Sequence, residues 1–254
     1  MQRFKTTIKI SWLWLPAILV LPYLHMGKLT CFIFFILSIH ELSHILVAKF
    51  FCLKIEKIIV YPFGLSAYIP QLGYGSVFQE ICIISAGPLS QVIFPSVFML
   101  TVKGGMISQS FYEYLLMINA NIMIFNLLPI YPLDGGRLLQ TFFHCFTRYK
   151  TAQRCTCIVS FLILLFVMSV QCMHGYSAIL VQLFLAIQLI ICYRDIHYDC
   201  MKFYHYRYLH SIKYPPILNT KKDLYRARYN LMKSKRGWRE EESWLASFFQ
   251  HQKR

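Results

Sequence analysis

The chain has 254 residues, of which 57% are hydrophobic, 17% are aromatic and only 15% are charged. A soluble domain typically has about 45–50% apolar and about 25% charged residues, so this chain has more apolar side chains than one core can bury. The composition therefore excludes an ordinary soluble domain and predicts an integral membrane protein. The formal net charge of +15 favours contact with anionic lipid.

Six apolar segments are candidates to cross a bilayer. They cover residues 11–25, 29–50, 81–102, 110–128, 156–172 and 177–193. We interpret the first as a membrane span and not a signal peptide, because no small-residue cleavage site follows it. The predicted fold class is an all-α polytopic membrane protein with about six transmembrane helices.

Basic residues are distributed unevenly between the two sides of this layout. Of the 26 Lys and Arg residues, only Lys28 and Lys103 fall on one side, and the others lie before the first span, after the second and fourth, or after the sixth. The positive-inside rule therefore predicts that both termini are cytosolic. The nine cysteines lie mostly within spans or on the cytosolic side, without framework spacing, which indicates a reducing compartment.

The segment between the second and third spans, residues 53–79, is too polar to cross the membrane. Its β-branched and aromatic runs 55–61 and 66–69 flank Pro62-Phe63-Gly64, and this pattern predicts a short β-hairpin lying against the membrane. An open hairpin edge could hold an unwound substrate segment by strand addition. A purely structural hairpin is the alternative.

The stretch His40-Glu41-Leu42-Ser43-His44 places ionisable side chains inside the apolar second span. Such side chains cost about 2.5–3.5 kcal/mol at the centre of a membrane helix, which marks them as functional candidates. On a helix, the two histidines share one face and can bind one ion, while Glu41 lies beside them. This H-E-x-x-H spacing is typical of zinc hydrolases, whose Glu accepts a proton from metal-activated water. Simple hydrogen bonding within a bundle would not explain the spacing.

Asp134 is the predicted third metal ligand. It lies in a segment broken by Pro129, Pro132 and two glycines, and such a break at membrane depth is tolerated only where the backbone is buried in protein or lines a polar cavity. Two histidines and one carboxylate are a known ligand set for catalytic zinc. The other carboxylates lie on the predicted hairpin, at a span start, on the far side or in the tail.

Two further stretches have weaker functional interpretations. Asn126, near the end of the fourth span, is a candidate to hydrogen-bond a substrate carbonyl or oxyanion, and helix capping is its alternative. The small residues Ser85-Ala86-Gly87-Pro88 in the third span are interpreted as a site of close helix packing.

With these residues in view, the chain resembles the site-2 protease family of intramembrane metalloproteases. The resemblance rests on HELSH at 40–44, on Ala86-Gly87-Pro88 and on the run NLLPIYPLDGGR at 126–137. The compact layout and the last run look like the stage IV sporulation protein FB type of endospore-forming bacteria.

The resemblance implies that His40, His44 and Asp134 bind one Zn²⁺ per chain and that Glu41 activates water. It implies further that the substrate is an inactive membrane-associated pro-sigma factor, pro-sigma-K, whose pro-sequence is removed. Inhibitory membrane proteins are the implied partners, and the implied location is the mother-cell membrane surrounding the forespore. No direct nucleic-acid contact is expected, and a homo-oligomer is left open.

The expected domains are a six-span metalloprotease domain at 1–195 and a basic cytosolic tail at 196–254. The family's sporulation members usually end in a nucleotide-sensing domain of paired β/α units, but residues 194–254 contain no Val and only one Thr. A sheet is therefore not expected there, and 223–230 and 240–249 are predicted as short helices. The fourteen basic residues after position 193 favour anionic lipid over nucleic acid as their contact.

Three other functions fit this sequence less well. Another membrane zincin with a different substrate would take a Glu ligand from a later helix, but the last two spans contain no acidic residue before Asp195. A divalent-metal transporter would need polar residues on several spans and an internal repeat. A catalytically dead scaffold would not need the complete set of His40, Glu41, His44 and Asp134.

Overall fold

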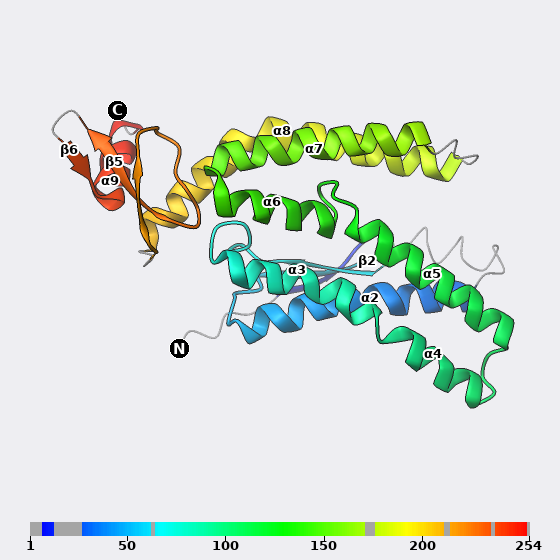
Figure 1. Cartoon of the computed structure of the whole chain (residues 1–254). Helices are drawn as coiled ribbons and strands as arrows, with labels where there is room; N and C mark the ends of the chain where they lie inside the picture. The colour runs from blue at the N-terminus through cyan, green and yellow to red at the C-terminus, as the bar shows by residue number, and fades with distance from the viewer. Residues whose placement is uncertain are drawn as a thin grey trace. The chain divides into compact units, whose positions relative to one another are not determined.

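A computed structural model describes residues 7–12, 27–61, 64–170, 176–210, 214–234 and 237–252 (Figure 1). These residues form two compact units. The first comprises residues up to 72 together with 78–127, and the second comprises 73–77 together with 128–254.

The described residues of the first unit form three strands and four helices. In chain order they are β1 (Thr7–Ile10), α2 (Gly27–Phe50), β2 (Lys57–Tyr61), β3 (Gly64–Tyr68), α3 (Val77–Gln91), α4 (Phe94–Lys103) and α5 (Gln109–Leu127). The second segment of this unit begins at Phe78, so all of α3 except its first residue, Val77, belongs to it. One apolar cluster, built around Ile36, Phe94, Phe98 and Leu115, joins α2, α4 and α5.

The predicted hairpin is present as a strand pair. Strands β2 and β3 are antiparallel, with Lys57 opposite Tyr68, and β1 pairs in parallel with the other edge of β2. Ile45 and Ala48 of α2 pack with Ile55 and Ile69 at the two ends of the hairpin. The sheet is thereby fixed to the helix that carries HELSH. Its position against a membrane stays a prediction.

Four helical segments of the described residues are long and apolar enough to cross a membrane: Gly27–Phe50, Val77–Lys103, Tyr149–Ser169 and Ile179–Leu209. They overlap four of the six predicted spans. The predicted span 110–128 is the helix α5, which is not among the four, and 11–25 lies almost entirely outside the described residues. The mostly helical membrane fold is thus confirmed, while the number of six spans stays a prediction.

The second unit contains α6 (Asp134–Phe146), α7 (Tyr149–Val170) and α8 (Tyr176–Leu209), followed by β4 (Pro216–Asn219), β5 (Tyr229–Ser234), β6 (Gly237–Arg239) and α9 (Glu241–Gln252). Helices α7 and α8 run side by side (Figure 1). The expected domain boundary at 195 falls inside α8, which continues to Leu209.

The tail contains a sheet, so the expectation that it has none was wrong. Strand β5 pairs in parallel with β4 and antiparallel with β6. The predicted helix at 240–249 is confirmed as α9, whereas 223–230 is a turn leading into β5. The sheet could not be predicted from local β propensity, because it is stabilised by buried polar contacts between segments that are distant in the sequence.

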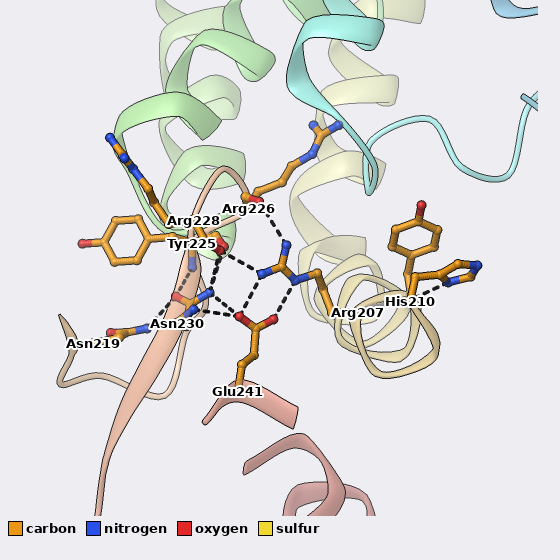
Figure 2. Close-up of polar contacts among 9 residues, drawn as sticks. Arg207, His210, Asn219, Tyr225, Arg226, Arg228, Asn230 and Glu241 are labelled. Carbon is orange, nitrogen blue, oxygen red and sulfur yellow. Dashed lines mark hydrogen bonds and ion pairs between the residues drawn. The ribbon is translucent and has the colours of Figure 1, made fainter. Parts of the chain in front are cut away.

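Those contacts centre on Glu241 at the start of α9 (Figure 2). Arg207 of α8 donates from Nε and Nη2 to its two carboxylate oxygens at 2.6 and 2.8 Å. The backbone N–H and the side-chain Nδ2 of Asn230 donate to Oε2 at 2.8 and 2.9 Å. Arg207 also donates to the carbonyls of Arg226 and Arg228. One buried ion pair therefore links α8, the turn before β5, and α9.

The second unit also includes the short segment Gly73–Val77, which precedes most of α3 in the chain. Nε of the buried Arg226 donates to the carbonyl oxygen of Gly75 at 3.1 Å. The ring of Tyr74 lies 6.4 Å from that of Tyr149 and 6.1 Å from that of Tyr206, centroid to centroid. The contacts of residues 73–77 are thus made with the C-terminal half of the chain.

Candidate metal centre

The HELSH residues form one continuous part of α2, as their spacing predicts. His40 is 3% exposed and His44 is partly buried, and their ring centroids are 4.8 Å apart. The Nε2 atoms of the two rings face each other at 3.2 Å. Two nitrogen ligands of a tetrahedral zinc, each about 2.0–2.1 Å from the ion, lie about 3.3 Å from each other. The histidine pair therefore has the spacing of two ligands of one ion.

The second nitrogen of His44 is held by α3. Nδ1 lies 2.7 Å from the carbonyl oxygen of Ile83, and since a carbonyl can only accept, Nδ1 carries the proton and donates it. In the neutral ring this leaves the lone pair on Nε2, the atom that faces His40. Such a hydrogen bond from the non-ligating nitrogen orients metal-binding histidines generally.

Gly87 of α3 lies directly against the two imidazoles. A Cβ atom at position 87 would be 2.4 Å from Nε2 of His44 and 2.6 Å from Nε2 of His40, far inside van der Waals contact. Any side chain here would fill the space onto which both nitrogens point. Close packing was predicted at Gly87, and the structure shows that the side chains packed against it are His40 and His44, the metal-binding candidates.

Glu41 follows His40 on α2 and is partly buried. Successive helical residues are rotated by about 100°, so its carboxylate lies to one side of the histidine pair and not on the same face. A carboxylate in that position can exchange protons with a molecule bound at the histidines without itself being a ligand.

In the second unit, Asp134 is the first residue of α6 and is partly buried. The helix follows Leu133, which has extended backbone angles and provides no side-chain cap. The N–H groups of a first helical turn favour a negative charge there, so the start of α6 is a suitable position for a carboxylate that binds a cation.

The broken segment before Asp134 is fixed by backbone contacts. Ser160 of α7 accepts from the N–H of Tyr131 at 3.1 Å and donates to the carbonyl of Pro129 at 3.4 Å. A Cβ at Gly136 would lie 2.3 Å from the carbonyl carbon of Ile130, so the first turn of α6 and this segment approach closely only because residue 136 is glycine. The two contacts determine where α6 begins.

Asn126 lies one residue before the C-terminal end of α5 and is partly buried. It belongs to the first unit, with His40 and His44, whereas Asp134 belongs to the second. Sequence reasoning missed the carbonyl of Ile83, which any residue type could provide. It predicted close packing at Gly87 but not that the histidine rings are the partners.

Comparison with known proteins gives consistent results. The model of peptidase family M50 matches residues 101–170. Stage IV sporulation protein FB of Bacillus subtilis is 34% identical over 203 residues, which cover 77% of this chain and 69% of that protein. A zinc metalloprotease of Methanocaldococcus jannaschii is 38% identical over 108 residues, covering 40% of this chain and 30% of that protein.

The fold is similar to a solved structure as well. The site-2 protease from Methanocaldococcus jannaschii aligns with a TM-score of 0.54 at 24% identity, over 76% of this chain and 94% of that chain. The chain belongs to peptidase family M50, the site-2 proteases, and is of the stage IV sporulation protein FB type. It is accordingly an integral membrane zinc metalloendopeptidase with Zn²⁺ as its cofactor.

Proposed function

We propose that this protease cleaves its substrate at a zinc ion held by His40, His44 and Asp134. The observation that carries the proposal is the convergence of the two histidine Nε2 atoms, 3.2 Å apart, over the bare backbone of Gly87. The three side chains are a set of metal-ligating groups of the type that catalytic zinc uses.

In this mechanism the protein's own residues orient the reactants and move the proton. When bound, zinc would supply a Lewis acid that polarises the scissile carbonyl and lowers the pKa of water towards about 7. Glu41 accepts the proton from the attacking water and later donates it to the leaving amine. Asn126 donates a hydrogen bond to the substrate carbonyl oxygen, where negative charge develops.

For the substrate, we propose the pro-sequence of a sporulation sigma factor, pro-sigma-K. The support is the 34% identity to a sporulation protein together with the family resemblance of residues 126–137. On the same ground, the enzyme lies in the mother-cell membrane around the forespore and is inhibited by partner membrane proteins. The distribution of Lys and Arg supports cytosolic termini.

The proposal also assigns a role to the hydrolase domain as a whole, to the basic tail and to the hairpin. Residues up to about 195 carry the hydrolase, and the basic residues of 196–254 contact anionic lipid at the cytosolic face. The hairpin of β2 and β3 lies against the membrane and receives the unwound substrate segment beside β3.

The test is co-expression with a tagged pro-sigma factor, comparing wild type, Glu41→Gln and Glu113→Gln. Glu113 is an exposed carboxylate on α5 and provides the matched control. We expect Glu41→Gln to lose cleavage by a factor of about 10² to 10⁴, because it removes the proton acceptor, and to keep about one zinc per chain by elemental analysis. The control should process normally.

Two outcomes would overturn parts of the proposal. Full cleavage by Glu41→Gln would show that another group accepts the proton. Cleavage of an unrelated membrane peptide but not of the pro-sigma factor, in wild-type protein that contains zinc, would leave the mechanism and reject the substrate.

A further inference from the structure

Two buried amides lie where α3 ends. Gln91, the last residue of α3, is 0% exposed, and Asn119 of α5 is 5% exposed. Nδ2 of Asn119 donates to the backbone carbonyl of Gln91 at 3.1 Å. Among the described residues, Nε2 and Oε1 of Gln91 and Oδ1 of Asn119 have no hydrogen-bond partner. One donor group and two acceptors are therefore buried together.

Such an arrangement is energetically unfavourable unless a small molecule provides the missing hydrogen bonds. Burying an amide without a hydrogen bond costs roughly 1–3 kcal/mol in proteins, and a hydrocarbon environment offers no solvent partner. The surroundings are apolar, since Ile36, Phe94 and Leu115 are all buried beside this point. Buried polar atoms of this kind are typically satisfied by ordered water, which needs two to four polar partners.

Gln91 lies one helical turn beyond the glycine that touches the histidine pair. Gln91 follows Gly87 by four residues, so it is on the same face of α3 and about 6 Å further along the axis. Position 87 is the one whose Cβ would collide with His40 Nε2. On α2, Ile36 lies one turn before His40 and belongs to the apolar cluster around Phe94. On α3, Gln91 is thus one turn beyond the glycine that touches the histidines, and Asn119 of α5 is joined to it through the Gln91 carbonyl.

We propose that Gln91 and Asn119 bind ordered water at the break between α3 and α4, and that this site supplies water to the reaction at His40 and His44. The two acceptor oxygens and the Nε2 donor match the hydrogen-bonding groups of water. The described residues argued above to lie here, Gln91, Asn119, Ile36, Phe94 and Leu115, are uncharged and so favour water over an ion. Hydrolysis consumes one water per peptide bond, its hydroxyl going to the acyl carbon and its proton to the amine. The supply role rests on the proposed function, whereas the water site itself does not.

The experiment is X-ray radiolytic labelling of the purified full-length membrane protein, which marks side chains beside bound water even when bulk solvent is excluded. Phe94 is the reporter, since it lies at the break and is 2% exposed, and Phe98, 1% exposed and one turn further along α4, is the internal reference. The variants are Gln91→Leu and Asn119→Leu, with Gln188→Leu, a partly buried position in α8, as the matched control.

We expect labelling of Phe94 above Phe98 in wild type and in Gln188→Leu, and its loss in Gln91→Leu and Asn119→Leu. We also expect kcat to fall by about tenfold in both of these variants, with KM and zinc content unchanged, because one hydrogen-bonded contact to water is lost. Equal labelling of Phe94 and Phe98 in wild type would refute the water site. Loss of labelling with an unchanged kcat would refute the supply role. Failure of the proposed function is seen separately, as cleavage by Glu41→Gln.

Discussion

Gly87 of α3 and His44 of α2 are in such close contact that a Cβ on the glycine would lie 2.4 Å from the imidazole Nε2. One turn earlier in the same helix, the carbonyl oxygen of Ile83 accepts a hydrogen bond from Nδ1–H of this ring. One helix thus orients the ring and leaves open the space in front of its ligating nitrogen.

Gly87→Ala should therefore abolish zinc binding. The added methyl group would occupy the space between the histidine nitrogens, and neither backbone nor ring can move away without losing the bond to Ile83. We expect substoichiometric zinc by elemental analysis and at least about 100-fold lower cleavage, since the metal supplies several kcal/mol of transition-state stabilisation. Gly27→Ala is the control, because no described residue lies within 4 Å of its Cβ position. Full zinc content in Gly87→Ala would contradict this geometry.

Asp134→Ala should lose zinc and activity together, in contrast to Glu41→Gln, which should lose activity only. The difference separates a ligand from a proton acceptor and is measured as zinc per chain in the two variants. Asp195→Ala, which removes a partly exposed carboxylate from α8, should bind zinc as wild type does. If Asp134→Ala retains one zinc per chain, Asp134 is not a ligand.

Gly136→Ala should destabilise the second unit. Its Cβ would lie 2.3 Å from the backbone of Ile130, an overlap that is typically relieved at a cost of about 1–3 kcal/mol. Denaturant titration of the protein in detergent measures the decrease in its free energy of unfolding. Gly104→Ala is the control, because its Cβ would come no closer than 3.4 Å to its neighbours. Equal stability of the two variants would show that the segment before α6 adapts freely.

Breaking the Arg207–Glu241 pair should unfold the tail sheet. Both side chains are buried, at 2% and 4% exposure, and removal of one partner from such a pair typically costs about 3–5 kcal/mol. We expect Glu241→Ala to expose β4, β5 and α9 to rapid hydrogen exchange. The exposed pair of Arg194 and Asp195 is the comparison, and Asp195→Ala should change stability by less than about 1 kcal/mol. Slow exchange of β5 in Glu241→Ala would refute the role of the pair.

The stability of the second unit should fall in mild acid because of His144. Burial, and secondarily the charge of Arg226, lower the pKa of His144 well below its usual 6.5. The unfolded chain therefore binds the proton first, so stability is unaffected well above pH 6.5 and falls as pH drops below it, by up to about 1.4 kcal/mol per pH unit. The slope of unfolding free energy between pH 7.5 and 5 should be smaller in His144→Phe. Equal slopes would show that other groups account for it.

The helix that carries HELSH could be predicted from sequence to within two residues, 29–50 against Gly27–Phe50, since a long apolar run has few alternatives in a membrane. The third span was predicted as one helix, but the structure interrupts it at Val92 and Ile93. Pro95 was the available signal, because proline is favoured in the first turn of a new helix, here α4.

Other features depend on contacts between distant residues and leave no local pattern. The tail sheet has little β-branched sequence and is held by Arg207, Asn230 and Glu241, which come from three separate elements. The partnership of His44 with a main-chain carbonyl has no sequence signature at all. Motif spacing predicted the residue types of the site, whereas their supporting groups required the three-dimensional structure.

The contacts of Gly73–Val77 have a consequence for how the protein can be divided. Gly75 accepts from Arg226, and Tyr74 packs near Tyr149, although residues on both sides of this segment belong to the other unit. A chain cut after Leu127 would leave residues 73–77 on the N-terminal fragment and their partners Arg226, Tyr149 and Tyr206 on the C-terminal one. Neither fragment could then complete its own set of contacts, so the two pieces would have to be produced together, by fragment complementation, for the C-terminal unit to form.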